Sequence, residues 1–335
     1  MSTMVDVARL AGCSISTVSH VVNGTRHVEA TTRERVMQAI AETGYKQDAV
    51  ARALRRSQSE SIGLVVSDAG QPAFAEMVHG VEQEAARLGL TLLLASSAED
   101  PARELKAVGA LLERRVDGLI LARTSGSVDE VITRVAEAKK PLVLMDRLFD
   151  VDLDQVGVEN QQPVQTVVAD LAARGHRRIA LIGGDLDVPT LSERHQGFVN
   201  GVSKAGLDSS DQLVCTGAVT EAQARTQVAD LLAAKNRPTA LVAASTVLAA
   251  GALYAVQDAR LSIPDDLAFA TFDGFAYADL FQPQLTTIRQ PAFEVGVRAM
   301  KLLAERMRKP KGRRKTIRLA PVIENRGSTA ASLAS

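Results

Sequence analysis

Apolar and polar residues repeat with two different periods along this 335-residue chain. Up to residue 44, apolar positions recur every three or four residues in short segments, which is the spacing of amphipathic helices. From Ser61 onward, short apolar runs alternate with longer amphipathic segments, and this alternation predicts buried strands separated by helices. The pattern therefore divides the chain into a small all-α part and a large α/β part.

The first two helices are predicted from the beginning of the chain. Residues Met4–Ala11 have helical spacing and stop at Gly12, and Ser14 is a suitable N-cap for a second helix that ends before Gly24. Helix, glycine-containing turn and helix together form the helix-turn-helix, whose second helix reads bases in the major groove of DNA. The inner face of this second helix carries Val18, Val21 and Val22.

A third helix and a short connecting segment follow. The third helix is expected to start at Thr31 or Thr32, through a capping box that ends in Glu34, and to stop before Gly44. Residues 48–56 are Ala-rich and helix-prone, but a helix this short is marginal in water by itself. Such a segment suits a conformational switch between the two parts, although an ordinary linker with helical tendency remains the alternative.

The large part contains two successive runs of strands and helices, at 62–158 and 163–272. This rhythm predicts two similar lobes built on doubly wound parallel sheets, with a ligand site in the cleft outside the carboxyl ends of the strands. We expect a helix-turn-helix domain at 1–47, a hinge helix and linker at 48–60, and a ligand-binding and dimerisation domain at 61–335. Within the last, the first lobe should comprise about 61–160 and 290–325 and the second about 161–289.

Composition excludes several classes of protein. Apolar residues make up 46% of the chain, Trp is absent, and the 39 basic residues balance the 39 acidic ones. No run of ~18 apolar residues predicts a membrane span, and no secretory signal precedes Asp6 and Arg9, so we expect a cytoplasmic protein. Cys13 and Cys215 are too few for a disulfide framework or metal cluster, and no nucleophile–base pair is recognisable. We therefore expect no metal, no cofactor and no enzymatic activity.

Over essentially its whole length the sequence resembles the LacI family of bacterial transcription regulators, and its DNA-reading part is most similar to the purine and ribose repressor branch. The resemblance implies a periplasmic-binding-protein-like core, operator DNA with palindromic symmetry, a homodimer and a small-molecule effector. It is carried by residues 4–12, 16–23 and 50–54 in the first part and by 115–120, 175–179, 264–267 and 285–291 in the core.

The resemblance also implies which residues contact DNA. Ile15, Ser16 and His20, at the start of the second helix, should reach base edges, and the hydroxyls of Thr17 and Ser19 suit phosphate contacts. Many relatives carry Arg at the position of His20, and histidine offers only one hydrogen-bond donor to guanine, so this position should discriminate more weakly between bases.

Four further positions complete the expected DNA interface. Asn23 is expected to fix the turn after the second helix, and Arg26 to contact a phosphate. By resemblance, Leu54 inserts into the central base step of the minor groove, beside the positively charged Arg55. This insertion loses base-stacking energy but allows the duplex to bend. A role for Leu54 as a small core residue is the alternative.

Seven positions in the core are expected to bind the effector. By resemblance, an aromatic ring at Phe74 packs on the ligand, Arg194 forks onto ligand oxygens, and Asp273 accepts sugar hydroxyls. The alternatives are lobe packing for Phe74 and an internal salt bridge for Arg194 and Asp273. The other four expected positions are Arg123, Arg147, Thr190 and Ser245.

Departures from the family pattern bear on the effector's charge. Ser245-Thr246 replaces the family's Asn-Asp pair and removes a carboxylate, while Arg123 and Arg147 stand where relatives often carry neutral or aromatic residues. These changes favour a sugar acid or sugar phosphate over a neutral sugar or polyol. We expect a ligand-responsive repressor of a carbohydrate or related catabolic operon. The main alternative is the solute-binding protein of a sugar transporter, which shares the two-lobed core but not residues 1–56.

Overall fold

The computed structural model describes residues 2–24, 26–45, 59–126, 129–275 and 277–330. The chain forms two compact units, Met1–Ser59 and Glu60–Ser335. Among the described residues, no helix combines the length and the apolar content needed to cross a bilayer.

The N-terminal unit is a bundle of three helices, α1 (Met4–Ala11), α2 (Ile15–Asn23) and α3 (Ala30–Thr43). Gly12 and Gly24 adopt the left-handed conformation after α1 and α2, as their positions in the sequence predict. The expected capping box at Thr31 is wrong, because α3 already begins at Ala30 and Glu29 caps it without a side-chain hydrogen bond. The core of the bundle consists of Val7, Ala8, Ala11, Val18, Val36 and Ala39.

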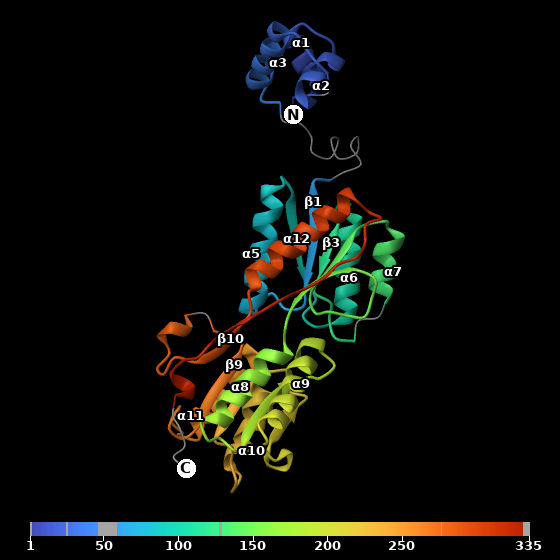
Figure 1. Ribbon diagram of the computed structural model, residues 1–335. Helices are drawn as coiled ribbons and strands as arrows, with labels where there is room; N and C mark the ends of the chain where they lie inside the picture. Colours follow the sequence, from blue (N-terminus) through green and yellow to red (C-terminus); the bar gives the residue numbers. More distant parts are fainter. Residues whose placement is uncertain (1, 25, 46–58, 127–128, 276, 331–335) are drawn as a thin grey trace. The chain divides into compact units, whose positions relative to one another are not determined.

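The first lobe of the large unit is a six-stranded sheet in the order β11-β5-β4-β3-β1-β2, with every pairing parallel. Figure 1 shows α5 and α12 side by side on one face of this sheet and α6 and α7 on the other. Its elements are β1 (Ser61–Val66), α5 (Pro72–Arg87), β2 (Thr91–Ser96), α6 (Pro101–Glu113), β3 (Leu119–Leu121), α7 (Glu130–Glu137), β4 (Leu142–Asp146), β5 (Asp154–Val158), α12 (Ala292–Arg308) and β11 (Thr316–Leu319).

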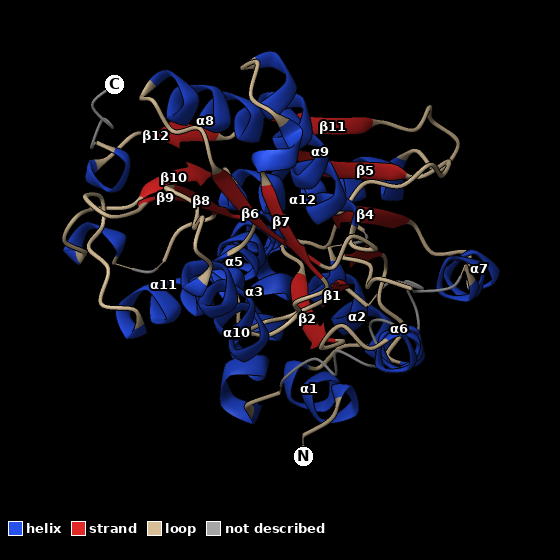
Figure 2. Ribbon diagram, turned by 90° about the horizontal axis from the view of Figure 1, so that it is seen from below, coloured by secondary structure: helices blue, strands red, loops and turns tan. Residues whose placement is uncertain are grey.

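The second lobe repeats this architecture with the order β12-β10-β9-β8-β6-β7. All its pairings are parallel except that of β12 with β10, and helices cover both faces of the sheet (Figure 2). Its elements are α8 (Gln161–Ala173), β6 (Ile179–Gly184), α9 (Pro189–Lys204), η1 (Ser209–Asp211), β7 (Leu213–Thr216), α10 (Glu221–Ala233), β8 (Ala240–Ala243), α11 (Thr246–Asp258), β9 (Ala268–Phe272), η2 (Ala278–Leu280), β10 (Thr286–Arg289), β12 (Val322–Glu324) and η3 (Gly327–Thr329).

These two sheets confirm the predicted fold class. The chain crosses between the lobes three times, after β5, after β10 and after β11. The expected extent of the first lobe, 290–325, is therefore wrong at its end, because β12 joins the second sheet and pairs antiparallel with β10. This pairing covers an edge of β10 that would otherwise present unpaired backbone groups.

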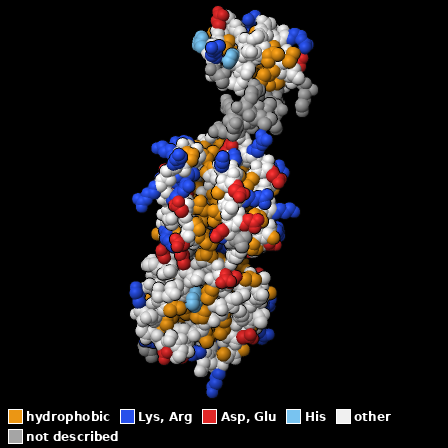
Figure 3. All heavy atoms as spheres, turned by 90° about the vertical axis from the view of Figure 1, so that its right-hand side faces the viewer, with side chains coloured by type: hydrophobic (Ala, Val, Ile, Leu, Met, Phe, Trp, Pro, Cys, Tyr) orange, Lys and Arg blue, Asp and Glu red, His pale blue; other side chains and the backbone are white. Residues whose placement is uncertain are grey.

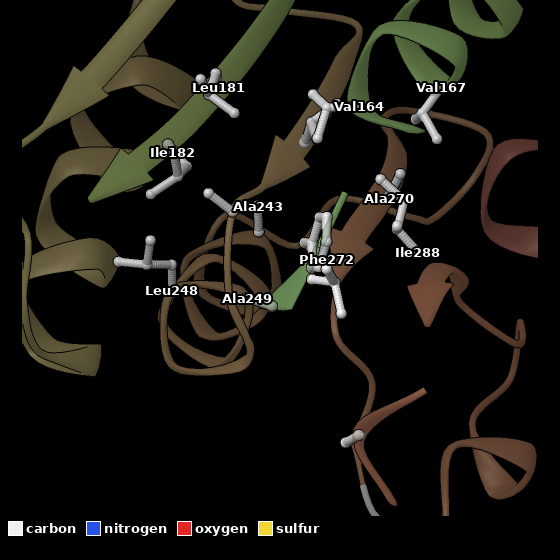
Figure 4. Close-up of a cluster of buried hydrophobic side chains, with 14 of the residues drawn as sticks. Val164, Val167, Leu181, Ile182, Ala243, Leu248, Ala249, Ala270, Phe272 and Ile288 are labelled. Atoms are coloured by element: carbon white, nitrogen blue, oxygen red, sulfur yellow. The ribbon is translucent and has the colours of Figure 1, made fainter. Parts of the chain in front are cut away.

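Aliphatic side chains form the lobe cores, as the composition predicts. In the second lobe, Val164 and Val167 of α8 and Leu248 and Ala249 of α11 pack among the side chains of the strands (Figure 4). In the first lobe, α5 and α12 approach each other so closely that a Cβ on Gly80 would lie 2.1 Å from the carbonyl oxygen of Phe293. Both cores hold the carboxyl ends of their strands in fixed positions, where the loops of the candidate site begin.

Candidate functional site

Helix α2 presents a row of polar side chains. The Ser14 hydroxyl caps the helix by accepting a hydrogen bond from the Thr17 backbone N–H at 3.1 Å, and its Oγ lies 2.8 Å from Thr17 Oγ1. At the other end, the Asn23 side-chain amide donates to the backbone oxygen of Ser19 at 2.7 Å and to its hydroxyl at 3.1 Å. The last turn of α2 is thus fixed by Asn23 itself.

The exposure of α2 fits a helix that presents one face to a partner. Ile15, at 48% exposure, and Ser16 lie on the surface, His20 is half-buried, and Arg26 beyond the helix is exposed. Val18 on the opposite face is fully buried, as the sequence predicts. The remaining expected DNA contacts, Leu54 and Arg55, lie outside the described residues.

A single cavity of about 780 Å³ contains most of the expected effector residues. Both lobes line it, because the loops after β1, β2 and β4 of the first sheet face those after β6, β8 and β9 of the second. Six of the seven predicted positions line this cavity, namely Phe74, Arg147, Thr190, Arg194, Ser245 and Asp273.

Three of these residues lie at helix amino ends. Thr190 is in the first turn of α9, Phe74 is in the first turn of α5, and Ser245 is the N-cap of α11. Pro189 opens α9, and Arg194 lies in the second turn of this helix. Helix amino ends direct backbone N–H groups toward the cavity, where they favour hydrogen-bond acceptors.

Arg194 is held rigidly. Its Nε donates to Asn160 Oδ1 at 2.9 Å, its Nη1 donates to the Ala244 carbonyl oxygen at 2.7 Å, and its guanidinium lies 3.4 Å from the centre of the Phe272 ring. The charge is 3.7 Å from Asp273 Oδ2. Burial lowers the pKa of this guanidinium from its usual value, while Asp273 and Asp146 raise it. The donors of Arg194 are therefore oriented before any ligand binds.

Two acids of the cavity, one from each lobe, are largely shielded from solvent: Asp146 is buried, and Asp273 is half-buried with 14% of its side chain exposed. The carboxylate of Asp273 accepts a 2.7 Å hydrogen bond from Gln290 Nε2, and burial raises its pKa. Asp146 is the last residue of β4 and was not predicted as a site residue. Both adopt a left-handed backbone conformation, with φ of 61° and 72°. Asn and Asp tolerate this conformation better than other non-glycine residues.

The two added arginines do not supply free positive charge to the cavity. Arg147 lines it, but its guanidinium makes a bidentate ion pair with Glu99 and donates to the Arg123 carbonyl oxygen at 2.9 Å. Arg123 is absent from the described lining and pairs with Asp129 at 3.2 Å, with its guanidinium 4.9 Å from the Phe149 ring. Of the seven predicted effector positions, Arg123 is therefore the one that does not line the cavity.

The lining is acidic overall. It contains six carboxylates and two guanidinium groups, and both guanidinium groups are within ion-pair distance of acids. The sequence analysis missed most of these acids, because only Asp273 matched a family contact position. Within the described ranges, no group of three His, Cys, Asp or Glu side chains is arranged to hold a metal ion. The lining residues that the prediction missed include Asp68, Gln71, Glu99, Asp146, Asp185, Thr220, Glu221 and Gln290.

Asp146 should make stability depend on pH. Burial raises the pKa of Asp146 from 3.8 to about 6, against the opposing effects of Arg147 and Arg194. The folded protein therefore keeps a proton that the unfolded chain loses, so raising the pH from 4 to 7 lowers the free energy of unfolding. Relative to the Asp146→Asn variant, which has no such proton, the wild type should lose about 2–3 kcal/mol of its free energy of unfolding between pH 4 and pH 7. Urea denaturation of both proteins at each pH measures this difference, and a pH-independent difference would contradict the shift.

The fold and the cavity together define a class of protein, in which a helix-turn-helix unit is joined to a two-lobed ligand-binding core. Comparison with known proteins specifies the class further. The lacI family of bacterial regulatory proteins matches residues 3–48, and the periplasmic binding protein-like domain matches residues 168–329.

Similar proteins cover nearly the entire chain. The ribose operon repressor of Escherichia coli K12 is 34% identical over 98% of this chain and 100% of its own length. The transcriptional repressor PurR of Mannheimia succiniciproducens is 32% identical over 98% of both chains. The lac repressor dimer bound to operator and the anti-inducer ONPF has 27% identity and a TM-score of 0.87, over 98% of this chain and 99% of its own. The chain belongs to the lacI family of bacterial regulatory proteins.

Proposed function

We propose that the chain represses a carbohydrate catabolic operon as a homodimer on palindromic operator DNA, and that a neutral sugar or polyol in the cavity controls its affinity for that DNA. The observation that carries this proposal is the cavity itself, because both lobes contribute oriented donors and acceptors to one site. A small ligand that bridges the lobes can bind the DNA-bound and the DNA-free conformations with different affinities. Only such a difference in affinity can shift the equilibrium between the two conformations.

The chemistry of the lining favours neutral hydroxyl groups. A hydroxyl can donate to the carboxylate of Asp273 or Asp146 and accept from Arg194 at the same time. A carboxylate or phosphate on the ligand would instead add negative charge beside the six acids of the lining, while Glu99 already neutralises Arg147. The volume of about 780 Å³ is ample for a monosaccharide. The similarity to a ribose operon repressor supports the same class of ligand.

DNA binding is assigned to α2 and to the hinge segment at 48–60. The exposed Ile15 and Ser16, together with Thr17, Ser19 and His20, are proposed to contact the major groove, and Arg26 a phosphate. Leu54 and Arg55 are proposed to act in the minor groove. We further propose that the lobes transmit ligand binding to this segment, because it joins the two units covalently.

A dimer is supported by exposed apolar side chains. Tyr277 and Leu280 are 82% and 79% exposed in the second lobe, and Leu94 is exposed on β2, the edge strand of the first sheet. We propose that these side chains belong to the surface that a second copy of the chain covers, since contiguous exposed apolar surface marks association sites in soluble proteins. A two-fold dimer would present two α2 helices to the two halves of a palindromic site.

The test begins with a DNA duplex that the full-length protein enriches from a random pool. Fluorescence anisotropy then measures its affinity in the presence of ribose, ribonate, glucose, gluconate and glucose 6-phosphate. At least one neutral sugar should change the affinity for the duplex by roughly tenfold or more. Its acidic counterpart should need a higher concentration to produce the same change. Failure to enrich any duplex would contradict the assignment as a regulator, whereas a stronger effect of an acid or phosphate would contradict only the ligand class.

A further inference from the structure

The first lobe has opposite charge character at the two ends of its sheet. Because all six strands are parallel, the segments that precede them meet at one edge, and the cavity lies at the other. Backbone hydrogen bonds connect these preceding segments to the sheet, as from Leu119 to Pro141 at 2.9 Å and from Gln155 to Lys315 at 2.8 Å. Segments 113–118, 137–141 and 305–315 are therefore neighbours at the amino edge, although they are distant in sequence.

These three segments carry a cluster of cations that we call the basic face. None of its members forms an ion pair in the described part of the chain, and nearly all are exposed to solvent. The three segments contain eleven Lys and Arg residues against four acids, Glu113, Asp117, Glu137 and Glu305, and Glu305 pairs with Lys315 at 2.7 Å. Asp150 and Asp152, which precede β5, add two acids at the same edge. Lys and Arg side chains gather toward this end of the lobe in Figure 3. The basic face consists of Arg114, Arg115, Lys139, Lys140, Arg308, Lys309, Lys311 and Arg313.

The segment that contributes half of the basic face is anchored to the lobe. The buried Arg306 donates to Asp154 at 2.7 Å, to the carbonyl oxygen of Gly312 at 2.6 Å and to that of Arg313 at 3.0 Å. These bonds fix the backbone between α12 and β11, so its lysines and arginines start from a defined position. Ordering them against a partner therefore costs less entropy than ordering a free tail.

The chain enters the core at this same edge. The backbone N–H of Glu60 donates to Asp117 Oδ2 at 2.9 Å, which places the start of the core beside segment 113–118. The 14 residue steps from Tyr45 to Ser59 span at most roughly 50 Å when fully extended. When the helix-turn-helix unit binds a duplex, this covalent tether keeps the basic face at high local concentration near the same DNA.

We propose that the basic face binds the phosphate backbone of the duplex held by the helix-turn-helix unit, as a second contact that is independent of base sequence. This inference rests on the proposed function as a DNA-binding regulator. The location of the exposed aromatic side chains favours DNA over an acidic protein as the partner. The centres of protein interfaces are enriched in aromatic residues, and the basic face consists of Lys and Arg alone. Among the described residues, the exposed aromatic side chains are Tyr254, Tyr277 and Phe281, all of them in the second lobe.

The test removes three cations of the basic face in the full-length protein, as K309Q/K311Q/R313Q. Each phosphate contact contributes about 0.9 to the slope of log affinity against log salt. The variant should therefore lower this slope by about 2–3 for each protomer that contacts the duplex, or about 5 for the proposed homodimer, on a duplex enriched by the wild type. Its preference for that duplex over a random one should stay unchanged. The matched control, K204Q/K235Q/R260Q, removes the same charge from exposed and unpaired positions of the second lobe.

The outcomes separate the two proposals. A lower slope for the first variant with a wild-type slope for the control supports the basic face as a DNA contact. Equal slopes for the wild type and both variants would overturn it, as would an unchanged DNA titration accompanied by lost binding of an acidic protein. If the wild type enriches no duplex at all, the proposed function itself has failed. Circular dichroism of each variant shows whether it is folded.

Discussion

Asp273→Asn is expected to weaken ligand binding about a hundredfold, because it removes the charged acceptor that is proposed to bind a ligand hydroxyl. The substitution keeps the shape of the side chain, and Asn tolerates the left-handed backbone at this position, where φ is 61°. Arg194 stays in place in the variant, because Asn160, the Ala244 carbonyl oxygen and the Phe272 ring hold it independently of Asp273. Ligand-free DNA affinity should therefore stay within about threefold of the wild type.

Isothermal titration with the sugar that acts on the wild type measures this loss, and anisotropy with the enriched duplex measures DNA binding. The control is Asp185→Asn, the same chemical change at another carboxylate of the lining, which accepts a hydrogen bond from the Asp187 backbone N–H at 3.0 Å. Asp185 is half-buried and, unlike Asp273, forms no ion pair with Arg194 in the described part of the chain, so the affinity lost on its substitution should be small. Equal losses in the two variants would mean that the ligand does not engage Asp273 in particular.

The sequence predicted what depends on local periodicity. Helix α1 has the bounds that its apolar spacing and Gly12 indicated, and the alternation of strands and helices predicted both lobes. Six cavity residues were also found, because each lies at the end of a strand or the start of the next helix, where parallel sheets place their ligands. The start of α3 was predicted less accurately, because a capping box that fits Thr31–Glu34 in sequence is not formed and the helix begins at Ala30.

Charge pairing over long distances could not be predicted. Glu99 neutralises Arg147 across 48 residues, and only the folded sheet brings the loops after β2 and β4 together. The expectation of an anionic ligand followed from counting Arg147 and Arg123 as free cations. In the same way, the run of seven basic residues at 306–315 gives no sign that Arg306 is buried while its neighbours are not. The periodic pattern of apolar residues contains no information about the pairing of Glu99 with Arg147 or of Asp154 with Arg306.

Arg306→Met should lower the free energy of unfolding by about 3–5 kcal/mol, which is the usual cost of removing one partner of a buried ion pair. Asp154 is 2% exposed and accepts two hydrogen bonds from Arg306, at 2.7 and 3.0 Å. This pairing raises the pKa of the guanidinium, so the ion pair persists throughout the neutral range. Methionine fills a similar volume, so the expected loss is electrostatic rather than a cavity effect.

Urea denaturation measures the loss, and Arg298→Met on the same helix is the matched control. Arg298 pairs with Glu294 at 2.7 Å, but both side chains are exposed, so this variant should lose less than about 1 kcal/mol. Adding Asp154→Asn to Arg306→Met should recover part of the stability, because it removes the buried charge left without its partner. Equal losses for Arg306→Met and Arg298→Met would show that burial adds nothing to the pair. The anchoring of segment 309–313 by Arg306 would then need another explanation, since the carbonyl bonds of Gly312 and Arg313 depend on the same guanidinium.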